Sequence, residues 1–386
     1  MTIQFIDLRA QQERILARVQ ENISRVLAHG QYIMGPEIKD LEERLASYTG
    51  ARHAVSCSSG TDALLMALMA YGVGPGDAIF TSPFTFVATV EVISLLGATP
   101  VFVDIEPDTF NIDPTLLEKA ITALENKDPK IHPLPKGFEG LKPRGIIPVD
   151  LFGQPADYDR INALAAKKGL FVIEDAAQSF GAEYKGKKAC GLADVAATSF
   201  FPAKPLGCYG DGGMIFTDDD VLFDKMTSVR VHGKGSDKYD NIRIGINGRC
   251  DTLQAAILLA KFEIFPQEMD LRQVVANRYT SAMKENAHIQ TPLVKVGSLS
   301  AWAQYSLVSE KKDDILSALK KAGIPTAVYY PRPLHLQGAY VYLGHKPGDY
   351  PVSEEKAEKI FSLPMHPYLT ETEQRQIAEV ILDAVS

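Results

Sequence analysis

The chain has 386 residues, 46% of them hydrophobic and 23% charged, which is typical of a soluble globular protein with more than one domain. Its formal net charge of −8, with no block rich in Lys or Arg, argues against a nucleic-acid-binding surface. The first 28 residues carry charges from Asp7 to Arg18, so we expect neither a signal peptide nor a membrane span there.

Seven short apolar runs, bounded by Gly, Pro or Asp, are typical of buried strands. They cover residues 54–57, 78–81, 100–103, 145–149, 170–174, 195–201 and 213–217. Helical patterns at about 61–71, 85–97, 114–125 and 157–168 alternate with the first five runs. This alternation predicts a mostly parallel sheet with helices on both faces. No clear helix separates Glu174 from Val195, and a loop joins the last two runs, so we expect a mixed α/β sheet of seven strands.

The alternation of short apolar runs with helical patterns ends after residue 248. An apolar-periodic helix is expected over 251–265, continuing after a break at Pro266. Further strands are expected at 302–309 and 326–330, and helices near 311–322, 353–361 and 371–384. We therefore predict a large α/β domain over 1–248 and a smaller α+β domain over 249–386. The Pro-, Lys- and Gly-rich segment 125–143 is expected to be an exposed excursion.

The four cysteines are far apart and form no C-x-x-C pair. They are Cys57, Cys190, Cys208 and Cys250. This spacing suits neither a zinc site nor a disulfide framework. We expect a cytoplasmic protein that binds no metal and does not enter a membrane.

Lys204 lies in a tight loop between the last two strand-like runs. A desolvated lysine has a lowered pKa, and its neutral amine can form a Schiff base with an aldehyde. The same segment is also compatible with an ordinary turn whose lysine points to water. The loop alone does not decide between these two interpretations.

Three other segments could surround a ligand. Gly60 and Thr61 open a helix directly after a strand, where free amides and the helix dipole favour an anion. Asp175 ends an apolar strand, where a carboxylate could keep a ring nitrogen protonated, and Phe86 offers a flat face for stacking. Each has a structural alternative: a helix cap, a salt bridge or a core side chain. Together with Lys204 they are the parts needed to hold pyridoxal 5′-phosphate (PLP).

At these motifs the chain resembles the DegT/DnrJ/EryC1/StrS sugar aminotransferases, which are fold type I PLP enzymes. The resemblance runs from 5–8 (FIDL) to 363–367 (LPMHP). The motifs that carry it are 58–63 (SSGTDA), 174–179 (EDAAQS) and 199–204 (SFFPAK). Residues 201–213 (FPAKPLGCYGDGG) and 249–256 (RCDTLQAA) look most like enzymes that aminate C3 of UDP-linked 3-oxo-N-acetylglucosaminuronic acid.

The resemblance implies roles at the ring end of the cofactor. Lys204 would bond covalently to the cofactor and move protons, and Asp175 would pair with the pyridinium nitrogen. Gln178 would lie near the phenolic oxygen, and Phe86 would stack on the ring.

At the phosphate end, the resemblance implies that the backbone amides of Gly60 and Thr61, with the Ser199 hydroxyl, hold the phosphate. Asn247 matches an asparagine that reaches the phosphate from a neighbouring subunit. The resemblance thus implies a homodimer with shared active sites.

On the substrate side, Arg249, Tyr330 and His335 stand near positions that resemble sugar-nucleotide contacts, although His335 suits a structural role equally well. The expected reaction moves an amino group from L-glutamate to a UDP-linked 3-oxo-sugar for bacterial surface polysaccharide, such as lipopolysaccharide O-antigen. The alternatives are amination of a 4-oxo or dTDP-linked deoxysugar, a PLP-dependent sugar dehydratase, or a regulatory homologue without turnover. Dehydratases of this type have histidine in place of the lysine, so Lys204 argues against them.

Overall fold

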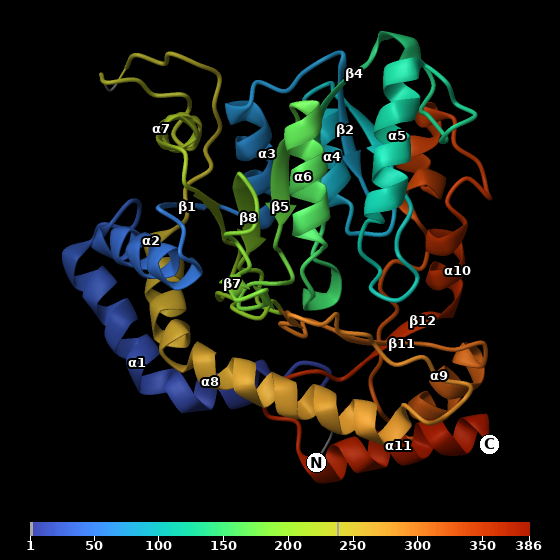
Figure 1. Ribbon diagram of the computed structural model, residues 1–386. Helices are drawn as coiled ribbons and strands as arrows, with labels where there is room; N and C mark the ends of the chain where they lie inside the picture. The colour runs from blue at the N-terminus through green and yellow to red at the C-terminus, as the bar shows by residue number, and fades with distance from the viewer. Residues whose placement is uncertain (1–2, 238) are drawn as a thin grey trace.

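A seven-stranded mixed sheet dominates the computed structural model, which describes residues 3–237 and 239–386 (Figure 1). The strands lie in the order β1-β9-β8-β5-β4-β2-β3. They are β1 (His53–Cys57), β2 (Asp77–Thr81), β3 (Thr99–Phe102), β4 (Lys142–Ile147), β5 (Phe171–Asp175), β8 (Val195–Ser199) and β9 (Gly213–Thr217). The neighbours from β8 to β3 are parallel, whereas β9 is antiparallel to both β1 and β8. The predicted α/β fold class is confirmed.

Helices cover both faces of this sheet (Figure 1). They are α3 (Gly60–Ala70), α4 (Ala88–Leu95), α5 (Pro114–Asn126), α6 (Tyr158–Lys168) and α7 (Asp220–Val229). Because successive strand residues point to opposite faces, the sheet supplies two hydrophobic cores. In β2, Phe80 lies in one core with Val172, while Ile79 lies in the other with Ile173.

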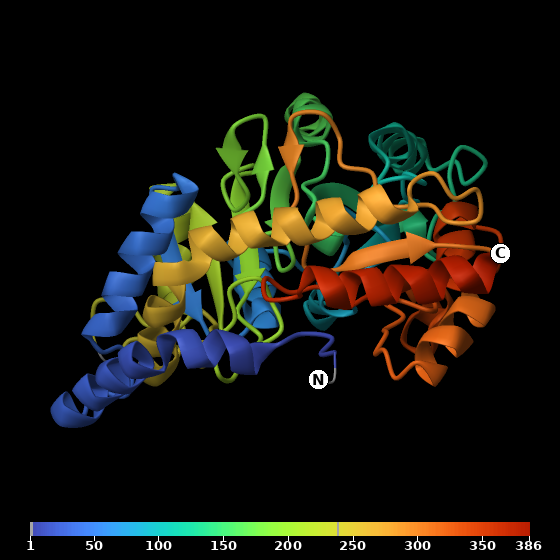
Figure 2. The same cartoon turned by 90° about the horizontal axis from the view of Figure 1, so that it is seen from below.

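One long helix, α8 (Thr252–Met283), runs below the sheet and reaches the C-terminal elements (Figures 1 and 2). The N-terminal helices α1 (Leu8–His29) and α2 (Pro36–Thr49) pack against it. The predicted break at Pro266 is wrong, because α8 continues through that residue. Proline costs a helix interior about 3 kcal/mol, but Phe265 and Met269 are both buried beside it, and this tertiary packing supports the helix.

The C-terminal part forms a third core around a two-stranded sheet. Strand β11 (Tyr305–Val308) pairs antiparallel with β12 (Ile360–Leu363). The helices around it are α9 (Lys312–Lys321), α10 (Pro351–Lys359) and α11 (Glu371–Val385). Ile3, near the other end of the chain, joins this core.

Two predictions for the C-terminal part are wrong. The predicted strand 326–330 makes only the isolated bridge Ala327↔Ser362, and the segment beyond it forms the short 3-10 helices Leu334–Leu336 and Gly338–Leu343. The predicted helix 353–361 ends at Lys359, where β12 begins, because the apolar residues that follow pair with β11 instead.

Two connecting segments are more ordered than the sequence predicts: one contains short strands and the other a buried side chain. The helix-free interval between β5 and β8 contains β6 (Glu183–Tyr184) and β7 (Lys187–Lys188), which form a small sheet with β10 (Ser298–Leu299). The prediction that the excursion 125–143 is exposed is wrong in part, because His132 within it is buried. The imidazole Nε2 of His132 lies 2.8 Å from the carbonyl oxygen of Phe102. This contact ties the segment to the end of β3.

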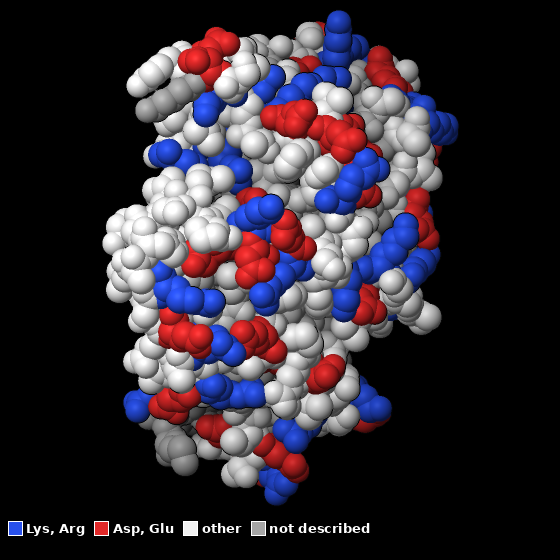
Figure 3. Space-filling model, turned by 90° about the vertical axis from the view of Figure 1, so that its left-hand side faces the viewer, with Lys and Arg blue, Asp and Glu red and all other residues white. Residues whose placement is uncertain are grey.

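The side of the molecule drawn in Figure 3 mixes both signs of charge over short distances. Arg18 on α1 pairs with Glu21 at 2.8 Å, and Arg44 on α2 pairs with Asp40 at 2.7 Å. No broad patch of a single sign covers this side (Figure 3).

Candidate active site

The loop that carries Lys204 connects β8 to β9 and is closed by backbone hydrogen bonds. The Phe200 amide donates to Gly212 O at 2.8 Å, and the Lys204 amide donates to Phe201 O at 2.9 Å. The Lys204 side chain is half-buried, and burial lowers the pKa of its amine, opposed by the charge of Asp175. A larger fraction of the neutral amine is therefore available at a given pH.

Asp175, the last residue of β5, is buried beside this lysine. Its carboxylate accepts a hydrogen bond from the Thr89 hydroxyl at 2.8 Å and one from the Ala177 amide at 3.2 Å. Burial raises the pKa of Asp175, while these two hydrogen bonds and the charge of Lys204 lower it. The carboxylate is thus fixed in one orientation and can face a positive charge in the adjoining space.

The expected anion site, called the cradle below, consists of the amides of Gly60 and Thr61 and the Ser199 hydroxyl. It lies where three strands meet. The register places Gly213, the first residue of β9, between Cys57 of β1 and Ser199 of β8. This brings the start of α3 against Ser199: a Cβ built on Gly60 would lie 2.6 Å from Ser199 Cβ. The amides of Gly60 and Thr61 have no acceptor within the helix, because they belong to its first turn.

Glycine is required on both sides of this junction. A Cβ on Gly213 would lie 2.3 Å from the carbonyl oxygen of Ser59. Ser59 itself caps α3, accepting a hydrogen bond from the Asp62 amide at 3.0 Å. The free amides of α3 and the Ser199 hydroxyl therefore share a small space that a methyl group would close.

Gln178 lies in the turn after β5 and connects two further segments. Its side-chain oxygen accepts from the Phe152 amide at 2.8 Å, and its Nε2 donates to the Tyr330 hydroxyl at 3.0 Å. Tyr330 has a left-handed backbone with φ of 60°, and its ring lies over Phe84 and Phe152. The structure thus brings Gln178 and Tyr330 into direct contact.

The loop before α4 supplies both an aromatic ring and a polar chain. Phe86 is 57% exposed, so one face of its ring is free to stack. Three residues later, Thr89 binds Asp175, and the Thr85 hydroxyl lies 3.1 Å from that of Thr89. Sequence reasoning assigned no role to Thr85 or Thr89, because the contact forms only where the start of α4 reaches the end of β5.

A family model for the DegT/DnrJ/EryC1/StrS aminotransferases matches residues 13–382. This chain belongs to that family. The UDP-2-acetamido-2-deoxy-3-oxo-D-glucuronate aminotransferase of Pseudomonas aeruginosa is 51% identical to it, over 95% of this chain and 96% of that protein. A pleiotropic regulatory protein of Geobacillus stearothermophilus is 42% identical, over 99% and 98% of the two chains.

Solved structures show the same fold as this DegT/DnrJ/EryC1/StrS aminotransferase. A family member from Brucella abortus superposes with a TM-score of 0.93 at 50% identity, covering 99% of each chain. NtdA of Bacillus subtilis, solved with its bound cofactor PMP, superposes with a TM-score of 0.86 at 28% identity, over 99% of this chain and 83% of that one.

The family depends on PLP, and the residues of this aminotransferase fit that cofactor. The free amides at the N-terminus of α3, with Ser199 packed closely against Gly60, suit a phosphate. Lys204 and buried Asp175 supply an amine and a carboxylate within electrostatic reach of each other. Within residues 3–237 and 239–386, no group of His, Cys, Asp or Glu side chains could hold a metal ion.

Asn247 and Arg249 lie close to this junction in the same chain. The amide of Ser58, just before the cradle, donates to the carbonyl oxygen of Gly248 at 3.0 Å. Arg249 Nε donates to Asn247 Oδ1 at 2.9 Å, and the Asn247 side chain is exposed. The two residues therefore form one polar unit at the surface of the aminotransferase.

His335 is not brought to an accessible surface. Its side chain is fully buried, and Nε2 lies 3.0 Å from a carboxylate oxygen of Glu354. Its ring packs against Tyr350 with centroids 4.7 Å apart. Burial lowers the pKa of His335, opposed by Glu354. The structure therefore supports the structural role that the sequence left open for this residue.

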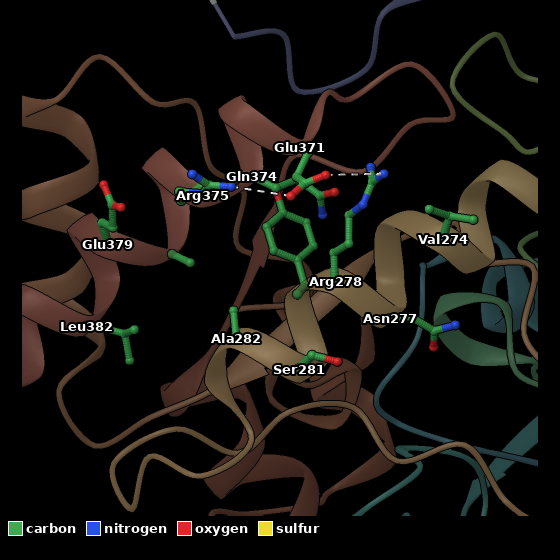
Figure 4. A pocket seen from close by; sticks show the side chains of 12 residues that line it. Val274, Asn277, Arg278, Ser281, Ala282, Glu371, Gln374, Arg375, Glu379 and Leu382 are labelled. Carbon is green, nitrogen blue, oxygen red and sulfur yellow. Dashed lines mark hydrogen bonds and ion pairs between the residues drawn. The ribbon is translucent and has the colours of Figure 1, made fainter.

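A hollow of about 680 Å³ lies elsewhere, between α8 and α11 (Figure 4). In it, Glu371 faces Arg375 at 3.3 Å and Arg278 at 3.9 Å, and the remaining lining residues come from the same two helices. None of the residues predicted for the cofactor line it. Among the described residues, no helix has the length and apolar character needed to cross a membrane.

Proposed function

We propose that this aminotransferase transfers the amino group of L-glutamate to the C3 ketone of a UDP-linked 3-oxo-N-acetylhexosamine or its uronic acid. The observation that carries this substrate assignment is the 51% identity, over nearly the whole of both chains, to an enzyme named for a UDP-linked 3-oxo-glucuronate. The buried Asp175 beside a lysine of lowered pKa supports the chemistry.

Bound PLP supplies an electron sink that stabilises negative charge on the α-carbon of an amino acid. The Lys204 amine, whose pKa is lowered by burial, accepts the proton from that α-carbon and returns it to the neighbouring carbon. Asp175 holds a proton on the ring nitrogen by its negative charge. Thr89 and Ala177 keep this carboxylate in place through the transfer.

The phosphate contacts lie where β1, β8 and β9 meet at the start of α3. The amides of Gly60 and Thr61 and the Ser199 hydroxyl hold the phosphate at the N-terminus of α3. Phe86 covers one face of the ring, and Gln178 orients the phenolic oxygen.

On the substrate side, Arg249 and Tyr330 contact the sugar nucleotide. Arginine is suited to a uronate because its planar fork binds a carboxylate with two hydrogen bonds. His335, being buried, supports the segment that follows Tyr330 and does not touch the sugar itself.

Arg249→Lys tests the carboxylate assignment. A lysine cannot make the bidentate contact, so kcat/KM for the uronate sugar should fall about tenfold, while that for the matching neutral sugar changes less than twofold. Equal losses on both sugars would contradict a contact between Arg249 and the carboxylate.

The enzyme functions as a homodimer in the cytoplasm, in a pathway to surface polysaccharide. Support comes from exposed apolar residues on the surface around Asp251 and Asn247: Ile33, which bridges to Asp251, its neighbours Tyr32 and Met34, and Ile244, three residues before Asn247. Pairing through this surface would bring Asn247 of one subunit to the phosphate of the other. Sedimentation of the purified protein tests the dimer.

The deciding experiment is a panel of nucleotide sugars with glutamate, following 2-oxoglutarate and the aminated sugar. The panel holds UDP- and dTDP-linked 3-oxo and 4-oxo sugars. The proposal expects the highest kcat/KM for a UDP-linked 3-oxo sugar. A preference for a 4-oxo or dTDP sugar would overturn the substrate assignment, and a protein that binds PLP without turnover would instead favour the regulatory alternative.

A further inference from the structure

Two carboxylic acids lie fully buried directly behind the proposed cofactor ring site. Asp150 follows β4, and Glu174 is the residue before Asp175 in β5. Because neighbouring residues of a strand point to opposite faces, Glu174 lies on the face away from Asp175. The parallel bridge Val149↔Asp175 puts Asp150 and Glu174 on the same face of neighbouring strands, where each carboxyl group affects the pKa of the other.

Both acids also accept hydrogen bonds from the surrounding chain. Asp150 Oδ1 accepts from the Ala156 amide and the Tyr158 hydroxyl, each at 2.9 Å, and Oδ2 accepts from the Ser179 hydroxyl at 2.7 Å. Glu174 accepts from the amides of Cys190 at 2.7 Å and Leu192 at 3.0 Å. None of these donors carries a positive charge.

Two buried acids on one face, with no cation among their partners, favour the retention of one proton. Two ionised carboxylates have no donor between them and would repel each other in a buried site. Asp150 receives three donors and Glu174 two, so a negative charge is better stabilised on Asp150. The charge therefore belongs to Asp150 and the proton to Glu174.

This pair is linked to the proposed cofactor contacts through short connections. The Asp150 amide donates to the carbonyl oxygen of Asp175 at 3.1 Å. Ser179, which binds Asp150, follows Gln178, and the Phe152 amide, two residues after Asp150, binds the Gln178 side chain. The loop after β4 and the turn after β5 are thus fastened to each other around one carboxylate.

We propose that Asp150 and Glu174 are a positioning pair that shares one proton and holds Asp175 and Gln178 in the orientation that the cofactor needs. The part that names the cofactor rests on the proposed function. The proton between the two acids does not.

The electrostatic surroundings agree with this assignment. Burial raises the pKa of both acids, and the charge of Asp150 raises that of Glu174 further. The titratable groups that face the pair are Tyr158 from α6, Cys190 after β7, and Asp175 across the strand. All three have pKa values raised first by burial, and none supplies a cation.

The shared proton predicts a sign for the pH dependence of stability. In the unfolded chain both acids ionise near pH 4, so at pH 7 the folded chain binds one proton more. Stability therefore falls as pH rises toward the raised pKa of Glu174 in the folded state. Each pH unit costs about a tenfold change in the folding equilibrium constant.

The direct test is infrared difference spectroscopy of the full-length protein at pH 7. The wild type should show the C=O stretching band of a protonated carboxylic acid that is absent from Glu174→Gln. The control Glu118→Gln, at an exposed side chain, should keep that band. If Glu174→Gln and wild type show the same band, or neither shows one, the shared proton is ruled out.

The positioning role is tested by the dissociation constant of PLP, followed by absorbance of the bound cofactor. Glu174→Gln turns an amide nitrogen toward one of the two backbone amides that donate to Glu174, so affinity should fall only several-fold. In Asp150→Asn an amide nitrogen, which cannot accept, faces one or more of the three groups that donate to Asp150. Binding of PLP should therefore weaken more than tenfold. Should that variant fail to fold, Ser179→Ala removes one contact only and should weaken binding several-fold.

Two outcomes would overturn positioning: Glu174→Gln as damaging as Asp150→Asn, or Ser179→Ala without effect. A wild-type protein that binds no PLP would refute the proposed function instead, and the infrared band would still report on the pair.

Discussion

The end of the large sheet that carries Lys204 and Asp175, called the edge below, and the segment 331–350 both contain buried ionisable groups. Burial shifts the pKa values of these groups in opposite directions in the two regions. At the edge, burial raises the pKa of the acids Glu174 and Asp175. In the segment, burial lowers the pKa of His335, and that of His345 to about 4. Burial opposes the charged form in both regions, so acid conditions favour the folded edge and disfavour the folded segment.

The two regions also differ in what holds their backbone. At the edge, strand register places Gly213 between Cys57 and Ser199, and a ladder of hydrogen bonds fixes it. The segment 331–350 consists of turns and short 3-10 helices, held at its ends by single bonds such as Leu334 N to Pro83 O at 2.8 Å. We therefore expect the chemistry to depend on the edge, while the segment supports Tyr330, the substrate-side residue directly before it.

The largest effect should come from the edge, at Lys204. Lys204→Ala removes the only amine that the mechanism uses to move the proton, so amino transfer should fall at least about 10³-fold. The measurement is 2-oxoglutarate formation at saturating sugar. Lys39→Ala, at an exposed ion pair, is the control and should retain full activity. Activity retained in Lys204→Ala would remove the basis for placing the chemistry at the edge.

The next largest effect tests the close contact between Gly60 and Ser199 in the cradle. Gly60→Ala places a methyl group 2.6 Å from Ser199 Cβ, and overpacking of this kind costs about 1–3 kcal/mol. The dissociation constant of PLP should therefore rise roughly 5- to 150-fold. The matched control is Gly338→Ala in the segment, where a Cβ meets nothing within 4 Å and binding should not change. Equal affinities for the two variants would show that no phosphate sits in the cradle.

The contrast also explains what the sequence could predict. Strand runs and the residues that follow them predicted the sheet, Lys204, Asp175 and the cradle, because in parallel sheets the strand ends determine where ligands bind. Glycines in the loop signalled tight turns, but their contacts with Ser59 and Ser199 required the register of three strands that are far apart in sequence.

Other features had no local signal. Pro266 predicts a helix break, yet packing on both sides keeps α8 intact. The run 326–330 has strand-like composition, but only Ala327 bridges to β12, and Tyr330 turns to a left-handed backbone. Thr89 contacts Asp175 only because the start of α4 reaches the end of β5. Tertiary competition, which a single sequence does not reveal, decided each case.

A third prediction sharpens the difference in pH response. Lowering the pH from 7 to 5 should open the segment, because the unfolded histidines bind protons near pH 6.5 and buried His345 resists until about 4. Protection of the amides of 334–343 against hydrogen exchange, corrected for the intrinsic rate, should fall by up to tenfold per pH unit for each histidine. Amides of β4 and β5 should keep their protection.

His345→Gln provides the control for that measurement. Its Nδ1 lies 3.5 Å from Asp349, and its Nε2 is buried without a partner among the described residues. Removing the titrating ring should reduce the acid sensitivity of 334–343 and leave that of other segments unchanged. An unchanged pH response would assign the effect to His335 or His132, whose pKa values burial also lowers.

The smallest effect lies at Tyr330, where the two regions meet. Tyr330→Phe removes the hydroxyl that accepts from Gln178 Nε2, and the loss of one neutral hydrogen bond costs about 0.5–1.5 kcal/mol. If Tyr330 serves the substrate, kcat/KM for the sugar nucleotide should fall roughly 2- to 10-fold while the dissociation constant of PLP stays within twofold. Tyr342→Phe, an exposed tyrosine of the same segment, is the control. A parallel loss of PLP affinity would instead place Tyr330 at the cofactor edge, since Gln178 would then transmit the change to the ring.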